Sequence, residues 1–267
     1  MEIQTWRELL EPYELAVDEL IIKFNHVIKQ YKERGIYCPM QRVTGRVKSI
    51  SSILDKMMKK SISFEEIPER MDDLSGIRII CQFTEDIEKV VEIIEARRDM
   101  RVKSVKDYVT KPKKSGYQSY HVIIYYTVHT FDGPKEILAE IQIRTMAMNF
   151  WSTIEHSLQY KYKQNLPADI SQKLKNASRA VIALDEEMAT VRGEVLDVQN
   201  VIQKKETLVT DILNNIQNLY KVANKREILK IQEEFYSIYA LDDLEKLQEF
   251  AKELDLISEG YMAQSLK

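Results

Sequence analysis

The sequence predicts an α+β fold, with a mixed β-sheet of about four to five strands flanked by helices and a helical C-terminal extension. Two observations support this prediction. Alternating apolar and polar residues indicate strands at 72–83, 100–109, 121–128 and 135–145. Apolar residues at helical spacing indicate helices before, between and after these strands. Because short links join the last three strands, the sheet is at least partly antiparallel.

The helices follow from the same patterns. The first covers 5–34 and ends at Gly35, a residue typical of helix C-caps. Residues 43–60 form a second, amphipathic helix with Gly45 and Arg46 at its start. The remaining predicted helices cover 85–98, 168–220 as one or two helices, 224–239 and 241–257.

Charged residues are unevenly distributed along the chain. From Asp185 to the end there are 17 acidic and 10 basic residues, although the whole chain carries a net charge of only −3. Basic residues concentrate instead between 97 and 121, which suggests a phosphate or polyanion ligand, although a solvated charged face has the same composition. We predict two domains: 1–195 carries the functional site, and 196–267 is a helical extension for packing or oligomerisation.

The composition excludes several classes of protein. Of the 267 residues, 44% are hydrophobic and 30% charged, as in ordinary globular proteins. The two cysteines, Cys38 and Cys81, have no C-x-x-C spacing, so we expect neither a disulfide framework nor a structural zinc site, and a reducing cytoplasm is the expected compartment. No apolar run approaches the length of a membrane span, and the N-terminal segment lacks the apolar region of a signal peptide.

The strand at 135–145 carries the first candidate site residues. Its alternation places Glu140, Gln142 and Arg144 on one face and isoleucines on the other. An acid, an amide and a cation in a row are suited to the wall of an active site. A sheet whose second face is simply solvated would show the same pattern, so this strand alone does not distinguish an active-site wall from a solvated face.

Other segments supply cations and further acids. Lys48, Ser52 and Lys56 share one face of the predicted helix 43–60 and are suited to nucleotide phosphates, although such a row is more often solvent-facing. Asp72 and Asp73 stand at the start of a strand, where carboxylates commonly bind Mg²⁺, but turn-forming acids are the alternative.

A basic loop completes the inventory. Lysines between 106 and 114 could hold further phosphates, and the ring of Tyr117, next to Gly116, could stack on a base. Two carboxylates, many cations and an aromatic ring together predict metal-assisted phosphoryl transfer on nucleotides, which needs no nucleophilic Ser or Cys.

Four segments carry these residues in order: TGRVKSISSIL, DDLSGIRIICQF, KPKKSGYQSYH and EIQIRTMAMNFWSTIEH. Their order and spacing closely resemble the synthetase domain of the RelA/SpoT homologues, and more narrowly the single-domain small alarmone synthetases of Firmicutes. The resemblance covers about residues 5–195. It implies a nucleotidyltransferase-like fold and transfer of the β,γ-pyrophosphate of ATP to the 3′-hydroxyl of GDP or GTP, giving ppGpp or pppGpp and AMP.

The resemblance also implies residue roles, with Mg²⁺ as the cofactor. Asp73 and Glu140 match the metal-binding acids, and Glu140 is also the candidate base for the 3′-hydroxyl. The implied nucleotide contacts are Arg46 and Arg78 at adenine, Lys48, Ser52 and Lys56 at the ATP phosphates, and Lys106, Lys113, Tyr117, His121 and Gln142 at the acceptor nucleotide.

Further expectations follow from the family. None of the four histidines is followed by Asp, so the His-Asp pair of the family's hydrolase domain is missing and we expect no hydrolase activity. Such small synthetases tend to form tetramers, and some respond to (p)ppGpp or single-stranded RNA. The alternatives are a nucleotidyltransferase of related fold and a catalytically silent RNA-binding module that uses the basic loop.

Overall fold

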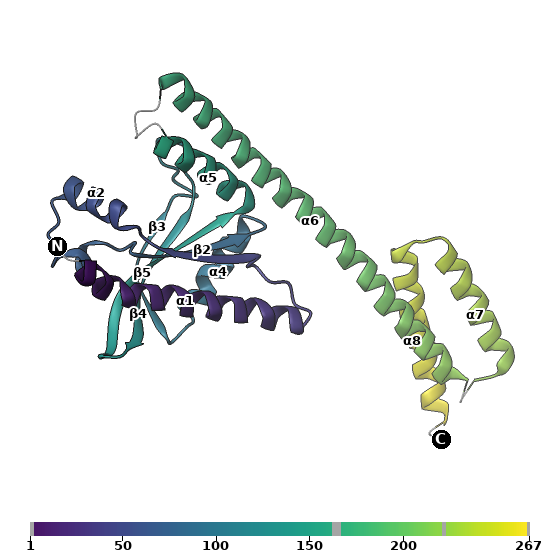
Figure 1. Ribbon diagram of the computed structural model, residues 1–267. Helices are drawn as coiled ribbons and strands as arrows, with labels where there is room; N and C mark the ends of the chain where they lie inside the picture. The colour runs from purple at the N-terminus through teal and green to yellow at the C-terminus, as the bar shows by residue number, and fades with distance from the viewer. Residues whose placement is uncertain (1–2, 162–166, 221–222, 266–267) are drawn as a thin grey trace. The chain divides into compact units, whose positions relative to one another are not determined.

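The computed structural model describes residues 3–161, 167–220 and 223–265. The chain forms two compact units, Met1–Thr190 and Val191–Lys267, whose division falls inside a long helix. The sequence prediction placed the division slightly later, after residue 195. The elements in chain order (Figure 1) are α1 Ile3–Glu33, β1 Arg42–Val47, α2 Ile50–Lys60, α3 Ile67–Arg70, β2 Ser75–Cys81, α4 Glu85–Glu95, β3 Met100–Asp107, β4 Tyr120–Thr130, β5 Gly133–Thr145, α5 Met146–Lys161, α6 Ala168–Leu219, α7 Lys225–Ala240 and α8 Leu244–Ser265.

The first unit is built on one five-stranded sheet with the strand order β1-β2-β5-β4-β3. Only β2 and β5 run parallel, and the other neighbouring strands pair antiparallel. The predicted α+β class with a mixed, partly antiparallel sheet and C-terminal helices is therefore confirmed.

The segment 43–60 is the main error of the prediction. Its first residues form β1, and the helix begins only at Ile50, where the Ser49 hydroxyl caps the backbone N–H of Ser52. Gly45 and Arg46 are therefore strand residues and do not stand at a helix start. The apolar spacing fits both assignments, and pairing of β1, an edge strand of the sheet, with β2 decides between them.

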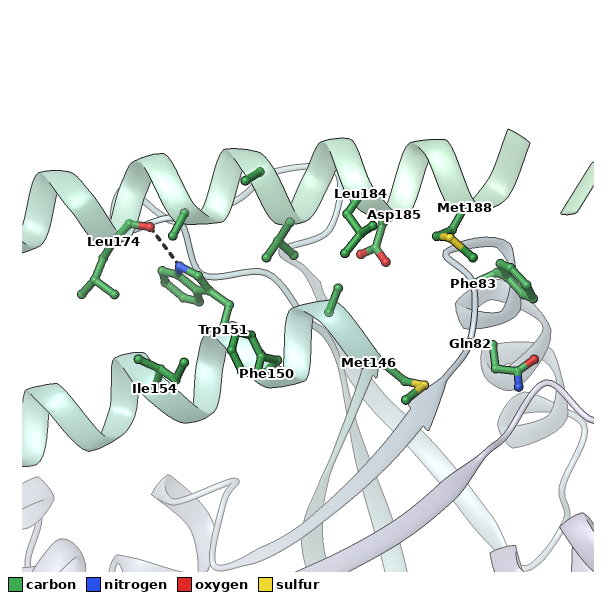
Figure 2. Close-up of a pocket in the computed structure, with 14 residues that line it drawn as sticks. Gln82, Phe83, Met146, Phe150, Trp151, Ile154, Leu174, Leu184, Asp185 and Met188 are labelled. Atoms are coloured by element: carbon green, nitrogen blue, oxygen red, sulfur yellow. Dashed lines mark hydrogen bonds between the residues drawn. The ribbon is translucent and has the colours of Figure 1, made fainter. Parts of the chain in front are cut away.

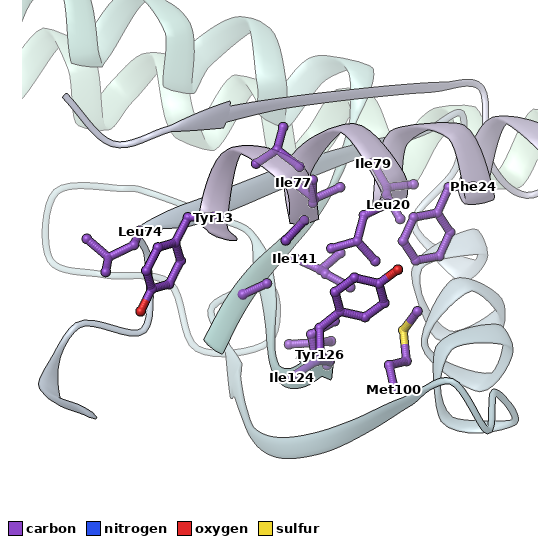
Figure 3. Packing of buried hydrophobic residues seen from close by; sticks show 14 of the residues in the cluster. Tyr13, Leu20, Phe24, Leu74, Ile77, Ile79, Met100, Ile124, Tyr126 and Ile141 are labelled. Carbon is purple, nitrogen blue, oxygen red and sulfur yellow. The ribbon is translucent and has the colours of Figure 1, made fainter. Parts of the chain in front are cut away.

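One face of the sheet carries the hydrophobic core (Figure 3). The long helix α1 lies along this face and buries Leu20 and Phe24 completely. On the strands, the isoleucines that alternate with the polar residues of β2 and β5 point into the same core. The amphipathic pattern of these strands is thus satisfied by α1 on one side, which leaves the opposite face for polar residues.

The strand register aligns the polar residues of the opposite face. Arg78 on β2 pairs with Gln142 on β5, Gln142 pairs with His121 on β4, and His121 pairs with Lys106 on β3. Directly paired residues point to the same side of a sheet. Four residues that lie far apart in the sequence therefore form a single row across the sheet, and Glu140 stands two residues from Gln142 on the same face.

The second unit has its own core. Apolar residues of the C-terminal part of α6 pack against α7 and α8, and Leu219 and Leu247 are fully buried there. The helices predicted for this region are present, with α8 starting three residues later than expected. Among the described residues, no helix combines the length and apolarity needed to cross a membrane.

The close approach of α1 to β1 explains Gly45. A Cβ atom at this position would lie 2.8 Å from Val17 Cγ1 and 2.9 Å from Ile77 Cδ1, well inside van der Waals contact. We expect Gly45→Ala to lower the free energy of unfolding by about 1–3 kcal/mol, as overpacking of a core does. Denaturant unfolding measures this.

Gly193→Ala is the matched control. A Cβ atom there meets nothing within 4 Å, and the site lies inside α6. Because alanine favours helices over glycine by about 1 kcal/mol, this variant should be as stable as the parent or more stable. Equal stability of Gly45→Ala and the parent would contradict the packing of α1 on β1.

Candidate active site

Asp73 is held by two lysines at the mouth of β2. Lys48 Nζ lies 2.8 Å from Asp73 Oδ2, and Lys56 Nζ lies 2.6 Å from Asp73 Oδ1. Burial opposes ionisation of Asp73, but the hydrogen bonds from Lys48 and Lys56 prevail and hold its pKa below the ordinary value. The structure thus brings together three predicted site residues, and the aspartate is an anion at neutral pH.

Lys48 reaches this position differently from the sequence prediction. It precedes α2 rather than lying on it, since the helix begins at Ile50, whereas Lys56 lies on α2. Ser52 lies in the first turn of α2, where its hydroxyl accepts a hydrogen bond from the Ser49 hydroxyl at 2.9 Å. Two of the three predicted phosphate-binding groups therefore converge on one carboxylate, and the third lies on the exposed helix start.

Glu140 is the second carboxylate of the site, and it is buried. His121 Nδ1 lies 2.9 Å from Glu140 Oε1, and the Gln142 amide donates to Glu140 Oε2 at 2.7 Å. Burial raises the pKa of Glu140, but the hydrogen bonds from His121 and Gln142 outweigh it and lower the pKa below its usual value. The charge of Asp73 acts in the opposite direction, so the two carboxylates lie near enough to interact.

A chain of hydrogen bonds orients His121. Arg144 donates to the Tyr117 hydroxyl at 2.5 Å and to the Gln142 side-chain oxygen at 2.9 Å, and the Tyr117 hydroxyl lies 2.8 Å from His121 Nε2. Because Tyr117 accepts from Arg144, it can donate to Nε2, which leaves the imidazole proton on Nδ1 facing Glu140. Arg144 therefore acts through Tyr117 and Gln142 on the position of the carboxylate.

Arg144, which belongs to the predicted polar wall of the site, is almost fully buried. Its Nε also donates to the Ser119 hydroxyl at 3.1 Å. The alternation of β5 placed Arg144 on the correct face, but only the structure reveals its partners. A buried arginine on a strand whose other polar residues are candidate ligands is the signal that could have identified it.

Arg46 and Arg78 line a small pocket at the β1–β2 edge, about 120 Å³ in volume, together with Gln142 and two glycines. Burial lowers the pKa of Arg78, and the neighbouring Arg144 and Arg46 charges lower it further. Among the described residues, the buried Arg78 Nε has no hydrogen-bond partner. Cations gathered in this way favour an anionic or π-rich ligand.

On the other side of Glu140, Lys113 lies over the aromatic rings. Its Nζ is 4.6 Å from the centroid of the Tyr117 ring and 4.5 Å from that of Tyr108. Tyr117 is half-buried and held through its hydroxyl, whereas the sequence suggested an exposed ring. Lys106 extends the row and lies 3.5 Å from Asp72, which also pairs with Lys103 at 3.0 Å.

Helix α5 adds polar residues that are not among the predicted binding residues. Asn149 Oδ1 and Ser152 Oγ are buried and have no hydrogen-bond partner within the described part of the chain. Burial raises the pKa of Glu155, while the nearby Lys113 and Arg144 lower it. Burial lowers the pKa of His156, and Arg46, Arg78 and Arg144 lower it further. These residues share one helix face, and their spacing was the available signal.

The carboxylates fit a magnesium site. Mg²⁺ is typically bound by one or two carboxylates, with substrate phosphates and water completing its shell, and Asp73 and Glu140 supply such a pair. Asp72 lies against the lysines Lys103 and Lys106 of β3. Among the described residues, no group of three or more His, Cys, Asp or Glu is arranged as a metal cage, so substrate oxygens would have to contribute.

A larger groove lies away from this site, between α5 and α6 (Figure 2). Its volume is about 830 Å³, and Phe150, Ile154, Leu184 and Met188 are among its mainly apolar lining residues. Trp151 bridges the two helices by donating from Nε1 to the Leu174 carbonyl oxygen at 2.9 Å. None of the predicted site residues lines this groove, and its apolar walls are unsuited to nucleotide phosphates.

The chain is similar to known proteins in sequence and in structure. The model of a region found in RelA and SpoT proteins matches residues 45–165. The GTP pyrophosphokinase YjbM of Bacillus subtilis (strain 168) is 46% identical over 206 residues, which cover 77% of this chain and 97% of that protein.

Two crystal structures of small alarmone synthetase 1 from Bacillus subtilis are similar to the chain. The structure bound to its product pppGpp has a TM-score of 0.70 and 47% identity, covering 72% of this chain and 98% of that one. The structure bound to AMPCPP has a TM-score of 0.64 and 44% identity, covering 73% of this chain and 99% of that one.

The hydrogen bond from Gln142 gives a testable pH dependence. A carboxyl whose folded pKa lies below its unfolded value stabilises the fold above the unfolded pKa, and this stabilisation is lost as pH falls through the folded pKa. Gln142→Leu should raise the pKa of Glu140 and lower the free energy of unfolding near neutral pH by about 1–3 kcal/mol. The deficit should shrink towards pH ~4, where Glu140 is increasingly protonated in both proteins.

Urea unfolding at several pH values measures this difference. Gln172→Leu is the control, because that exposed amide bonds to Asn176 and to no carboxylate. A Gln142→Leu deficit that does not change with pH would contradict the coupling between Gln142 and Glu140.

Proposed function

The chain belongs to the RelA/SpoT family and, within it, to the small alarmone synthetases; from this premise we propose that it transfers the β,γ-pyrophosphate of ATP to the 3′-hydroxyl of GDP or GTP. The products are ppGpp or pppGpp and AMP. The observation that carries the proposal is the pair Asp73 and Glu140, two ionised carboxylates on a sheet face otherwise lined by cations. The relatives named above are GTP pyrophosphokinases, and one solved relative holds pppGpp.

In the proposed reaction the 3′-oxygen of the acceptor forms a bond to the β-phosphorus of ATP. The bond between that phosphorus and the oxygen bridging to the α-phosphate breaks, and AMP leaves with the electron pair. Glu140 takes the proton of the 3′-hydroxyl. Because its pKa is low, Glu140 is ionised but is a weak base, so cations must stabilise the developing alkoxide.

We assign the ATP side to β1, β2 and α2. Arg46 and Arg78 flank the small edge pocket, where guanidinium planes can stack on adenine. Lys48 and Lys56 supply ammonium groups, and Ser52 a hydroxyl, for the phosphates. In the described structure Asp73 engages both lysines, and ATP phosphates would compete for them and free the carboxylate for Mg²⁺. When bound, that ion would neutralise phosphate charge.

We assign the acceptor side to β4, β5 and α5. The ring of Tyr117 offers a stacking surface for guanine, Lys113 and Lys106 offer charge for the acceptor phosphates, and His121 lies beside them against Glu140. Guanine carries N–H donors on its Watson–Crick edge, and the buried, unpartnered Asn149 Oδ1 is an acceptor suited to them. Gln142 completes this side by holding Glu140 next to the acceptor hydroxyl.

Two rival functions lead to different products. A nucleotidyltransferase of related fold would release inorganic pyrophosphate and form a nucleotidylated product, whereas the proposed enzyme releases AMP. A silent RNA-binding module would form neither, and it has no use for two carboxylates among its cations. Because a hydrolase His-Asp pair is missing from the sequence, we also propose that the chain does not degrade its product.

Identical subunits are the proposed partners. The groove between α5 and α6 exposes Phe150, Met146 and Ile154, and a monomer gains nothing by leaving such a patch in water. We propose that this face joins subunits of a homotetramer, as is usual for small synthetases. Single-stranded RNA and (p)ppGpp are the candidate regulators, and the cytoplasm, which holds ATP and GDP, is the proposed compartment.

Replacement of the candidate base tests the reaction. Glu140→Gln keeps the shape of the side chain but cannot accept the proton, so we expect synthesis of guanosine tetraphosphate from ATP, GDP and Mg²⁺ to fall by roughly 100-fold or more. Mass analysis of nucleotides measures AMP and product together. Glu136→Gln, on the same strand but exposed and paired with Arg101, should retain parental activity.

Turnover of Glu140→Gln at the parental rate would refute the assignment of Glu140. Release of pyrophosphate by the parent would favour the nucleotidyltransferase, and the absence of either product would favour the binding module.

A substitution in the groove tests the proposed assembly of subunits. Phe150→Asp places a charge on the proposed subunit interface and should lower the mass measured by light scattering below that of a tetramer. Phe131→Asp, at the exposed turn between β4 and β5, makes the same chemical change elsewhere and should leave the mass unchanged. Equal masses for both variants and the parent would exclude this face as the interface.

A further inference from the structure

One apolar stripe runs along the whole of α6. Its residues alternate at spacings of three and four, the pattern of a coiled-coil seam, with a single exception at Lys205. We call this stripe the α6 seam. Its members are Leu174, Ala177, Val181, Leu184, Met188, Val191, Val195, Val198, Ile202, Lys205, Val209, Ile212, Ile216 and Leu219.

The two ends of the α6 seam have partners within the chain. Up to Met188 it lines the groove that faces α5 (Figure 2). From Val209 onward its residues pack against α7 and α8, where Ile212, Ile216 and Leu219 are buried. Lys205 marks the edge of this second contact, because it pairs with Asp242 at the α7–α8 connection.

The middle of the seam is exposed. Met188 and Val191 are each 42% exposed, Val195 50%, Val198 59% and Ile202 52%. These five residues occupy successive seam positions over about two heptads, and the first of them, Met188, also lines the groove that faces α5. The seam pattern therefore continues without interruption through a stretch that neither α5 nor the α7–α8 hairpin covers.

The spacing of the apolar residues indicates which kind of partner can cover this stretch. Alternation of three and four residues suits knobs-into-holes packing against another helix, rather than against a sheet or a small molecule. Val195 and Ile202 stand at the a positions and Val191 and Val198 at the d positions, so β-branched side chains form the seam of this stretch. Because packing at both ends already holds α6 helical, association does not have to supply the cost of helix formation.

The flanking charges specify a second copy of this chain. With Val195 at an a position, Glu187 is a g residue and Arg192 the e residue five positions later. In a parallel, in-register pair each Glu187 faces Arg192 of the partner, so two attractive pairs form by symmetry. In an antiparallel pair that crosses at this stretch, with Val195 packed on Val191, Glu194 would face Glu194 and Arg192 would face Arg192. Because like charges repel, this arrangement is less favourable than the parallel one.

We propose that Val191–Ile202 of α6 is a second self-association surface, which forms a parallel coiled coil with the same segment of another copy. This inference rests on the proposed assembly of identical chains but names a surface distinct from the groove at Phe150. It is independent of the transfer reaction, since no candidate catalytic residue lies on this segment.

Paired variants test the surface. Val195→Glu puts a carboxylate into the seam, and Leu196→Glu puts the same group on the adjacent residue, which is 46% exposed but lies off the seam. Both are made in the Phe150→Asp background, so that association through the groove is already impaired. We expect Val195→Glu to weaken dimerisation at least roughly tenfold in light-scattering dilution series, and Leu196→Glu to leave it unchanged.

A Phe150→Asp protein that is monomeric throughout the dilution series, or one that Val195→Glu and Leu196→Glu affect equally, overturns the proposal. If the groove at Phe150 is not an interface, the Phe150→Asp protein has the same mass as the parent. This result is therefore distinguishable from the effect of the seam variants. Retention of AMP release by the seam variants shows that their fold is intact.

Cross-linking tests the orientation. In a parallel, in-register pair each Val198 faces its symmetry mate, so Val198→Cys should form an intermolecular disulfide rapidly when diamide is the oxidant. Asp197→Cys, which points away from the seam, is the control, and the parent with Cys38 and Cys81 gives the background. Cross-linking of Val198→Cys no faster than that of Asp197→Cys excludes the parallel arrangement.

Discussion

The parallel pairing of β2 with β5 is the constraint on which the site depends. It places Gly76 beside Glu140 and Arg78 beside Gln142, although the members of each pair are 64 positions apart in the sequence. Asp73 comes just before β2, so the same pairing brings both carboxylates to one end of the sheet. A shift of one residue would turn Glu140 and Gln142 into the apolar core. Burial of the isoleucines against α1 therefore fixes the polar face as well.

Each carboxylate on that face has its own hydrogen-bond partners. Asp73 is paired with two lysines, and Glu140 is hydrogen-bonded to an imidazole and an amide, so both carboxylates stay ionised although they are largely shielded from solvent. The arginines lack an equivalent acid: the pKa of Arg78 is lowered by burial and by its cationic neighbours. The arginine side of the site therefore lacks anions. A bound polyphosphate would stabilise the charges most on this side.

The two units use helices for different purposes. In the first, α1 closes the core and α5 adds polar groups to the sheet face, so helix and sheet share one hydrophobic layer. In the second, stability comes from helix packing alone, around residues such as Leu219 and Leu247. The exposed stretch of the α6 seam belongs to neither core. Its apolar surface has a regular spacing, which distinguishes it from the isolated exposed apolar residues found on most proteins.

The sequence by itself determined the α+β class, the polar face of β5 and the helical tail, because period-two and period-3.6 patterns are local properties. It also pointed to Asp73 and Glu140, through four segments in a recognisable order. It misassigned β1 as a helix start, because only pairing with β2 stabilises that short strand. Tertiary structure alone decided that Asp72 pairs with lysines of β3, that Arg144 orients Tyr117, and which part of α6 is uncovered. These depend on register and packing between distant segments, which no local pattern encodes.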